Sequence, residues 1–121
     1  MKRSMMQVYV KNSSQAVAFY QKAFDAKIKC DHRNGDGTVG HAELDVFGQI
    51  FAISESDKAE TVTGNSMQFC LHFGKGSEEL VQRIIENLSD NGKFNYHGAT
   101  DWSPLMGDIV DKFGIRWCIF V

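Results

Sequence analysis

The sequence predicts an α+β fold made of two pseudo-symmetric βαβββ modules within a single domain, residues 1–121. Two observations carry this prediction: a phrase that recurs half a chain later, and a repeated order of strand-like and helix-like segments. DVFGQIFAI at 45–53 returns as DKFGIRWCI at 111–119, with Asp, Phe, Gly and Ile in register. Self-similarity of this kind indicates repeated supersecondary units.

Two further matches keep the same order along the chain. SMMQVYV at 4–10 aligns with NSMQFCL at 65–71 at an offset of 61 residues, which pairs Met6 with Met67. The helix-like segments 13–24 and 77–88 match at an offset of 64, and the Asp-x-Phe-Gly phrase matches at 66. Since loops of different length would cause this drift, we expect modules at 1–60 and 61–121 that superpose Met6 on Met67 and Gly48 on Gly114.

Each module is predicted to contain one amphipathic helix. The apolar residues recur at the spacing of a helix with one buried face. These are Val17, Tyr20 and Phe24 with Ala16 beside them, and Val81, Ile84 and Leu88 with Leu80 beside them. We expect Ser13 or Ser14 to cap the first helix and Ser77 the second. Glu78 and Glu79 suit the first turn of the second helix, and Gly92 suits a left-handed position after its end.

Eight strand-like runs surround these helices. They lie at 5–10, 27–33, 38–45 and 49–54, and at 66–73, about 93–97, 106–111 and 115–121. NGDG at 34–37 predicts a hairpin turn. The Phe-Gly steps at Gly48 and Gly114 predict turns between adjacent strands, so Phe47 and Phe113 are expected in similar environments.

Composition excludes several classes of partner. The formal net charge of −2 gives no basic surface for nucleic acid or an anionic membrane. The opening MKRSMMQVYV has no apolar run typical of a signal peptide or membrane span. Cys30, Cys70 and Cys118 are odd in number and form no Cys-x-x-Cys pair, which indicates reduced thiols in a cytoplasmic protein.

Three ordered segments resemble a known family. AVAFYQKAFDA at 16–26, GHAELDVFG at 40–48 and WSPLMGDIVDKFGIRWCIF at 102–120 are similar to the vicinal oxygen chelate superfamily of glyoxalase I, bleomycin-resistance proteins and ring-cleaving dioxygenases. The likeness is greatest to its PhnB-like branch. It implies a curved mixed sheet with a concave ligand cleft and a homodimer. Whether the modules pair within one chain or are swapped between two chains stays open.

The resemblance also implies where a metal would bind. Metal-using members place ligands near the start of the first strand of each module and four residues after the turn glycine. Those positions here are Met5 and Ser66, and Ala52 and Cys118. Because none offers a carboxylate or imidazole, we expect no metal and no glyoxalase activity. Many PhnB-like sequences are labelled methyltransferases, but the glycines here form no S-adenosylmethionine loop, so no cofactor is predicted.

Strand alternation assigns the candidate site residues to the face opposite the helices. These ligand-binding candidates are Gln7, His41, Glu43, Gln68 and Arg116. Arg116 suits either an anion clamp or a surface salt bridge. His41 and Glu43 suit either acid–base chemistry or a hydrogen-bonded polar pair. The two glutamines would either orient a ligand or bond each other. Cys70 and Cys118 are interpreted as small apolar filler, and Trp102 as a lid or dimer contact.

These residues favour a metal-free small-molecule-binding protein that forms a homodimer. The alternative is a lyase, isomerase or dioxygenase-like enzyme that uses His41 and Glu43 or a relocated metal site. A third interpretation is a purely structural dimeric module. The identity of the ligand, and whether the chain is catalytic, stay open at this point.

Overall fold

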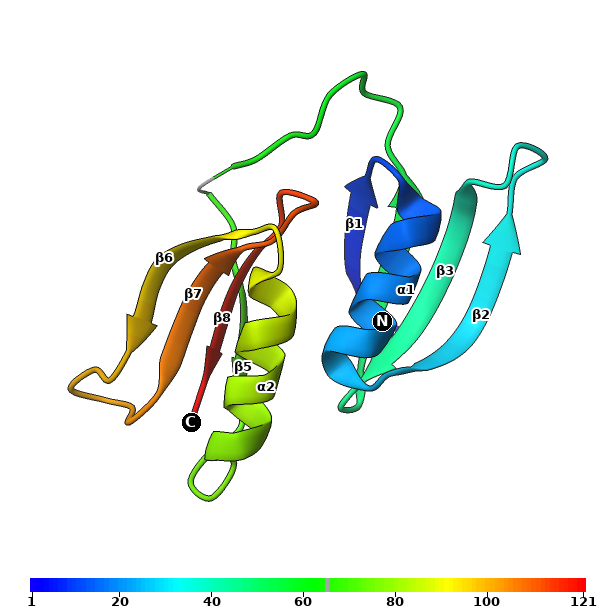
Figure 1. Cartoon of the computed structure of the whole chain (residues 1–121). Coiled ribbons are helices and arrows are strands. Elements are labelled where there is room, and N and C mark those ends of the chain that lie inside the picture. Colours follow the sequence, from blue (N-terminus) through cyan, green and yellow to red (C-terminus); the bar gives the residue numbers. More distant parts are fainter. Residues whose placement is uncertain (65) are drawn as a thin grey trace. The chain divides into compact units, whose positions relative to one another are not determined.

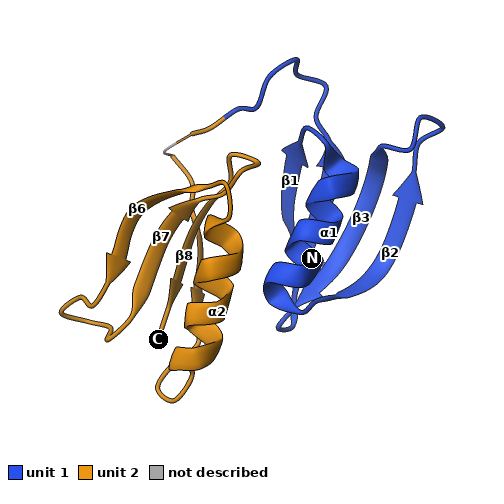
Figure 2. Cartoon of the chain, in the orientation of Figure 1, with its two compact units in different colours: residues 1–62 blue, residues 63–121 orange. Residues whose placement is uncertain are grey.

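A computed structural model describes residues 1–64 and 66–121, which form two compact units, 1–62 and 63–121 (Figures 1 and 2). Unit 1 contains β1 (Met6–Val10), α1 (Ser13–Phe24), β2 (Lys27–Arg33), β3 (Val39–Val46) and β4 (Gln49–Glu55). Unit 2 contains β5 (Phe69–His72), α2 (Glu78–Ser89), β6 (Lys93–Gly98), β7 (Met106–Val110) and β8 (Arg116–Phe120). The arrangement of both modules into one domain stays a prediction.

The two units have the same sheet topology. Their strand orders are β1-β4-β3-β2 and β5-β8-β7-β6, each a four-stranded sheet. In each, the first strand runs parallel to the last, and the other neighbours are antiparallel. The predicted α+β fold of two βαβββ modules is therefore confirmed. The curved sheet and concave cleft expected from both modules together stay predictions.

A β-bulge repeats at the same place in both sheets. The pairing of β2 with β3 shifts between Ile28 and Cys30, and the pairing of β6 with β7 shifts between Phe94 and Tyr96. Each bulge therefore contains one extra residue, Lys29 or Asn95. The repeat thus extends to a local irregularity that the sequence comparison did not identify.

The strand register corrects one part of the predicted alignment. Met6 pairs with Phe51, whereas the equivalent of Phe51, Trp117, pairs with Phe69. The counterpart of Met6 is therefore Phe69, two residues beyond Met67. Because side chains alternate along a strand, an even shift leaves each residue on its predicted face.

One helix packs on one face of each sheet (Figure 1). The predicted stripe of α1 is buried, and the Tyr20 ring meets Phe51 edge-on with centroids 4.8 Å apart. In α2, Val81, Ile84 and Leu88 are buried as predicted, and Ile85 joins them. We call the opposite face of each sheet its helix-free face. It carries the polar positions of the central strands.

The helix ends differ from the predictions. Ser13 is the first residue of α1, and Glu55 on β4 satisfies its N–H group at 3.0 Å and its hydroxyl at 2.7 Å. A carboxylate from the sheet therefore accepts the hydrogen bond at the start of the helix, where a serine hydroxyl was expected to do so. Ser77 precedes α2 as predicted, but its hydroxyl donates to the Gly74 carbonyl. Glu78 and Glu79 lie in the first turn as expected.

The residues after α2 are also corrected. Asn91 takes the left-handed conformation with φ 55°, and Gly92 does not. Gly92 is needed for space, because a Cβ there would lie 2.7 Å from the Val110 carbonyl oxygen. An asparagine tolerates positive φ better than most residues, which explains the exchange of roles.

The two Phe-Gly turns do not match in detail. The NGDG hairpin forms as predicted, with the Asn34 N–H donating to the Thr38 carbonyl at 2.8 Å. Phe47 has φ 53° and is 54% exposed, whereas Phe113 is only 7% exposed. The expectation of similar environments is wrong, because β3 and β4 are joined by a two-residue turn and β7 and β8 by a longer one.

Candidate functional site

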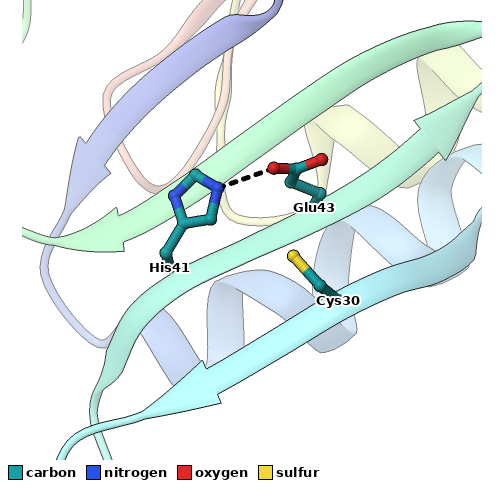
Figure 3. A group of neighbouring side chains, drawn as sticks. All are labelled: Cys30, His41 and Glu43. Atoms are coloured by element: carbon teal, nitrogen blue, oxygen red, sulfur yellow. Dashed lines mark hydrogen bonds and ion pairs between the residues drawn. The ribbon is translucent and has the colours of Figure 1, made fainter.

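Glu43 lies near the centre of the helix-free face of unit 1. Strand pairing sets it opposite Cys30 on β2 and Ala52 on β4, and Ala52 lies beside Gln7 on β1. His41 precedes Glu43 by two residues and so projects from the same face. Figure 3 shows Cys30, His41 and Glu43 pointing to the same side of the β2–β3 pair.

The Glu43 carboxylate is buried and paired twice. His41 Nε2 lies 2.8 Å from Oε2, which brings the predicted His–Glu pair together. Arg3, from the segment before β1, adds a bidentate contact, Nη1 to Oε1 at 2.7 Å and Nη2 to Oε2 at 3.0 Å. Hydrogen bonds from Arg3 and then His41 lower the pKa of Glu43 to about 2. Glu43 is therefore an ionised acceptor at neutral pH.

Gln7 is the third predicted site residue in unit 1. Its amide nitrogen donates to the Ser54 hydroxyl at 3.1 Å and to the Val8 carbonyl at 3.0 Å. The side chain is thus held along the β1–β4 edge of the helix-free face. Its amide oxygen is left as the group available to a ligand.

Asp108 occupies the corresponding place in unit 2. It pairs with Cys118 as Glu43 pairs with Ala52, and Ala52 and Cys118 were predicted to be equivalent. Arg116 binds it bidentately, Nε to Oδ1 at 3.0 Å and Nη2 to Oδ2 at 2.8 Å. The Arg116 guanidinium is the main reason that the pKa of Asp108 is lowered, despite partial burial.

Gln68 also binds Asp108, with its amide nitrogen 2.9 Å from Oδ1. The two predicted residues of unit 2, Gln68 and Arg116, are thus brought together by a carboxylate that the sequence reasoning missed. The repeat could have identified it, because Asp108 follows Glu43 at almost the same offset as the Asp-x-Phe-Gly phrase. Arg3 gave no such signal, since it lies outside every predicted strand.

Cysteine and aromatic side chains continue this face of unit 2. Cys118 pairs with Cys70 on β5, and burial raises the pKa of the Cys118 thiol to about 11, which suits the predicted filler role. The His72 ring stacks on Phe120 with centroids 4.5 Å apart. Trp102 meets Phe120 edge-on at 5.0 Å and is 58% exposed.

The predicted residues therefore fall into two groups. Gln7, His41 and Glu43 lie in unit 1, and Gln68 and Arg116 lie in unit 2. The four superfamily metal positions divide in the same way, with Met5 and Ala52 in unit 1 and Ser66 and Cys118 in unit 2. A single site formed by both groups stays a prediction.

A shallow pocket of about 280 Å³ lies elsewhere on unit 1. It is lined by Phe24, Asp25, Lys27, Asp45, Phe47 and Gly48. None of the predicted site residues borders it. Its lining comes from the end of α1, the start of β2 and the β3–β4 turn.

Comparison with known proteins gives a consistent answer about the fold. No family model matches the chain. Protein YjdN of Escherichia coli K12 is 26% identical over 131 aligned positions, covering 91% of this chain and 88% of YjdN. Protein PA1353 of Pseudomonas aeruginosa superposes with a TM-score of 0.82 at 17% identity, covering 99% of this chain and 97% of that one.

Two further structures share this fold. A PhnB protein from Bacillus cereus, described as a putative 3-demethylubiquinone-9 3-methyltransferase, has a TM-score of 0.82 at 23% identity and covers 98% of both chains. The fosfomycin resistance protein FosX of Listeria monocytogenes has a TM-score of 0.72 at 13% identity, covering 99% of this chain and 92% of its own. The chain has the vicinal oxygen chelate fold. The resemblance predicted from sequence is thus confirmed for the fold.

Within residues 1–64 and 66–121, neither α1 nor α2 has the length and apolar character that a membrane-spanning helix requires.

Proposed function

We propose that this chain is a small-molecule-binding protein of the glyoxalase/bleomycin-resistance type, close to the PhnB-like branch and without the superfamily metal site. The observation that carries the proposal is the helix-free face of β8. Arg116, Cys118 and Phe120 alternate along it, so a charged group and an aromatic group lie about 13 Å apart at its two ends. A small amphipathic molecule would span this distance.

The polar end can recognise an anionic or hydrogen-bonding group. Arg116 uses Nε and Nη2 on Asp108, and a guanidinium has five N–H donors, so donors on Nη1 remain for a ligand. Gln68 lies on the same carboxylate and can orient that group. FosX of Listeria monocytogenes was studied with Mn(II) and 1S,2S-dihydroxypropylphosphonic acid, which supports an anionic small molecule as the ligand class in this fold.

The aromatic end can hold a planar or apolar group. Trp102 is more than half exposed and meets Phe120 edge-on, and the Phe120 ring also stacks on His72. Exposed aromatic rings are often retained at binding surfaces, where they add stacking energy to apolar contact. This arrangement supports a ligand with an aromatic or apolar portion opposite its anionic group.

A thermal-shift screen of small carboxylates and phosphonates tests the proposal. We expect a specific ligand to raise the melting temperature by mass action. Trp102→Ala should weaken that ligand by up to about tenfold, because an aromatic contact contributes roughly 0.5–1.5 kcal/mol. Phe47→Ala is the matched control, since Phe47 is 54% exposed and lies on unit 1. Equal binding by the Trp102 variant and the parent protein would contradict the proposed site.

An enzymatic role is the second candidate, and the His41–Glu43 contact favours it. Glu43 is ionised, so it can hold His41 through Nε2–H and leave Nδ1 as a base toward a substrate. Such a carboxylate–histidine pair suits proton transfer in a lyase or isomerase. His41→Gln should then abolish turnover of a ligand found in the screen while its binding persists.

We also propose that the chain forms a homodimer in the cytoplasm. Exposed apolar residues such as Tyr9, Met67 and Phe94 support a second copy as the partner. All three cysteines are free thiols, which supports a reducing compartment. The formal net charge of −2 gives no support to a nucleic-acid or membrane partner.

A further inference from the structure

We propose that Cys30, His41 and Glu43 form a binding site for a divalent transition-metal ion of the zinc class. This site is formed by residues of β2 and β3 that are not among the four superfamily metal positions, although Glu43 pairs with one of them, Ala52. It does not depend on a ligand at unit 2. One potential ligand atom from each residue, a thiol sulfur, an imidazole nitrogen and a carboxylate oxygen, lies within 4.8 Å of the other two. All three side chains project from the same side of the two strands (Figure 3).

These separations are close to those of a metal site. Zinc bonds of about 2.0–2.3 Å in tetrahedral geometry place neighbouring ligand atoms about 3.3–3.8 Å apart. Side-chain rotation alone would bring the three atoms to that spacing. The backbone is already set, because Cys30 and Glu43 are paired across β2 and β3, in one register with the pair His32–His41. Strands hold such groups more accurately than loops do.

The ligand chemistry selects the class of metal. A sulfur, nitrogen and oxygen set suits zinc and its borderline neighbours, whereas magnesium and calcium prefer oxygen alone. A thiolate and a carboxylate together balance the charge of a divalent ion. Three protein ligands leave a fourth position for water or a small ligand. The His41 side chain is 36% exposed, so solvent reaches the cluster at this residue.

Arg3 is the internal competitor for this metal. Its guanidinium contacts both oxygens of Glu43 and supplies the positive charge that a metal ion would otherwise bring. The Arg3 side chain is 53% exposed and precedes β1, so it can move into solvent without disturbing the sheet. A metal ion must displace Arg3 at least from Oε2, which His41 also contacts.

Titration of the protein, prepared without a histidine tag, with Co²⁺ as a spectroscopic substitute for zinc tests the proposal. We expect one ion per chain and a charge-transfer band from a cobalt–thiolate bond, which Zn²⁺ then removes. Cys30→Ser should abolish the band and weaken binding by about 100-fold or more, since changes even in outer-shell partners cost about 10–100-fold. Cys70→Ser is the matched control and should retain the band, because Cys70 is an exposed thiol of unit 2.

Arg3→Ala tests the competition. Removal of one positive charge next to the ion should tighten Co²⁺ binding by about tenfold or more. An unchanged or weaker affinity would overturn the role of Arg3. A band that survives Cys30→Ser, or that is lost in Cys70→Ser instead, would overturn the metal site.

A second measurement needs no variant. Zn²⁺ should slow alkylation of Cys30 in the parent protein, read by peptide mass spectrometry, while Cys70 reacts at an unchanged rate. Equal alkylation of Cys30 with and without excess Zn²⁺ would overturn the proposal. The screen for a ligand at unit 2 is read separately, so failure of one proposal is distinguishable from failure of the other.

Discussion

Asp111, at the start of the turn between β7 and β8, is only 3% exposed. Its Oδ1 atom accepts the N–H groups of Phe113 at 2.9 Å and Ile115 at 3.1 Å. Its Oδ2 atom accepts the indole N–H of Trp117 at 2.9 Å, beneath the helix-packed face of β8. One carboxylate therefore fixes a turn and orients the largest core side chain of unit 2.

Asp45 occupies the corresponding position of the Asp-x-Phe-Gly phrase in unit 1 but accepts fewer hydrogen bonds. Its Oδ1 atom accepts the Gly48 N–H at 2.7 Å, on an exposed two-residue turn. The recurring Asp-x-Phe-Gly phrase thus has a physical basis in both units, since an aspartate closes each turn by accepting backbone N–H groups. Only in unit 2 does the carboxylate also reach the core.

We expect Asp111→Ala to destabilise the protein far more than Asp45→Ala. Hydrogen bonds to a charged acceptor contribute about 1.5–3 kcal/mol each, and the indole N–H of Trp117 would lose its carboxylate partner. The loss should be on the order of 3–5 kcal/mol for Asp111→Ala and about 1 kcal/mol for Asp45→Ala. Urea denaturation of the two variants measures the difference, and equal losses would show that the buried carboxylate has no special role.

At the residue scale, the sequence predicted which face of a sheet a side chain lies on better than it predicted which side chains are in contact. Strand alternation alone assigned His41 and Glu43 to one face, and the structure joins them by a hydrogen bond. Cys30 was missed as their neighbour because the register of β2 with β3 shifts between His32 and Arg33. Continued from the Arg33–Val39 pair, the register would set Lys29 opposite Glu43, whereas the shift sets Cys30 there. A bulge has no sequence signature comparable to that of a turn, so this contact depends on the folded sheet.

At the scale of elements, the contact between α2 and β7 is unusually close. A Cβ on Gly107 would lie 2.8 Å from Cγ1 of Ile85 and 2.9 Å from its Cδ1 atom. In unit 1 the corresponding position is Ala42, which is fully buried. The helix of unit 2 therefore lies so close to its sheet that a Cβ does not fit at this position. Unit 1 has room there for the methyl group of Ala42.

Gly107→Ala should destabilise the protein by about 1–3 kcal/mol through overpacking. Ile85→Ala removes the Cγ1 and Cδ1 atoms that the new Cβ would meet, so the double variant should lose less stability than the sum of the single variants. A double-mutant cycle measured by urea denaturation gives this coupling directly. Strict additivity would show that Gly107 is retained for a reason other than helix packing.

Element positions were predictable because their signals are local. Apolar spacing located both helices, and turn residues located the ends of most strands. The start of β5 was not predicted, since β5 begins at Phe69 and residues 66–68 continue the same apolar alternation outside the sheet. Strand pairing determines such an end, and pairing depends on contacts distant in sequence.

At the scale of the whole molecule, the two edge strands β2 and β6 differ in how well they are protected against pairing with another chain. β2 carries Lys27, Lys29, Asp31 and Arg33, charges of the kind that discourage pairing with another chain. β6 has the sequence KFNYHG, with Phe94 42% exposed and Tyr96 44% exposed. An edge strand with two partly exposed aromatic side chains favours association with a second copy.

The expected homodimer should therefore depend on β6 rather than β2. Phe94→Glu should shift the protein toward the monomer in sedimentation velocity at micromolar concentration, because a charge would enter the apolar edge. Ile28→Glu is the matched control, since Ile28 occupies the same repeat position on β2 and is 41% exposed. High salt should leave the dimer intact, because burial of apolar surface is not screened. A stable monomer of the parent protein would contradict the dimer. Dissociation by Ile28→Glu but not by Phe94→Glu would show that the contact involves β2 instead of β6.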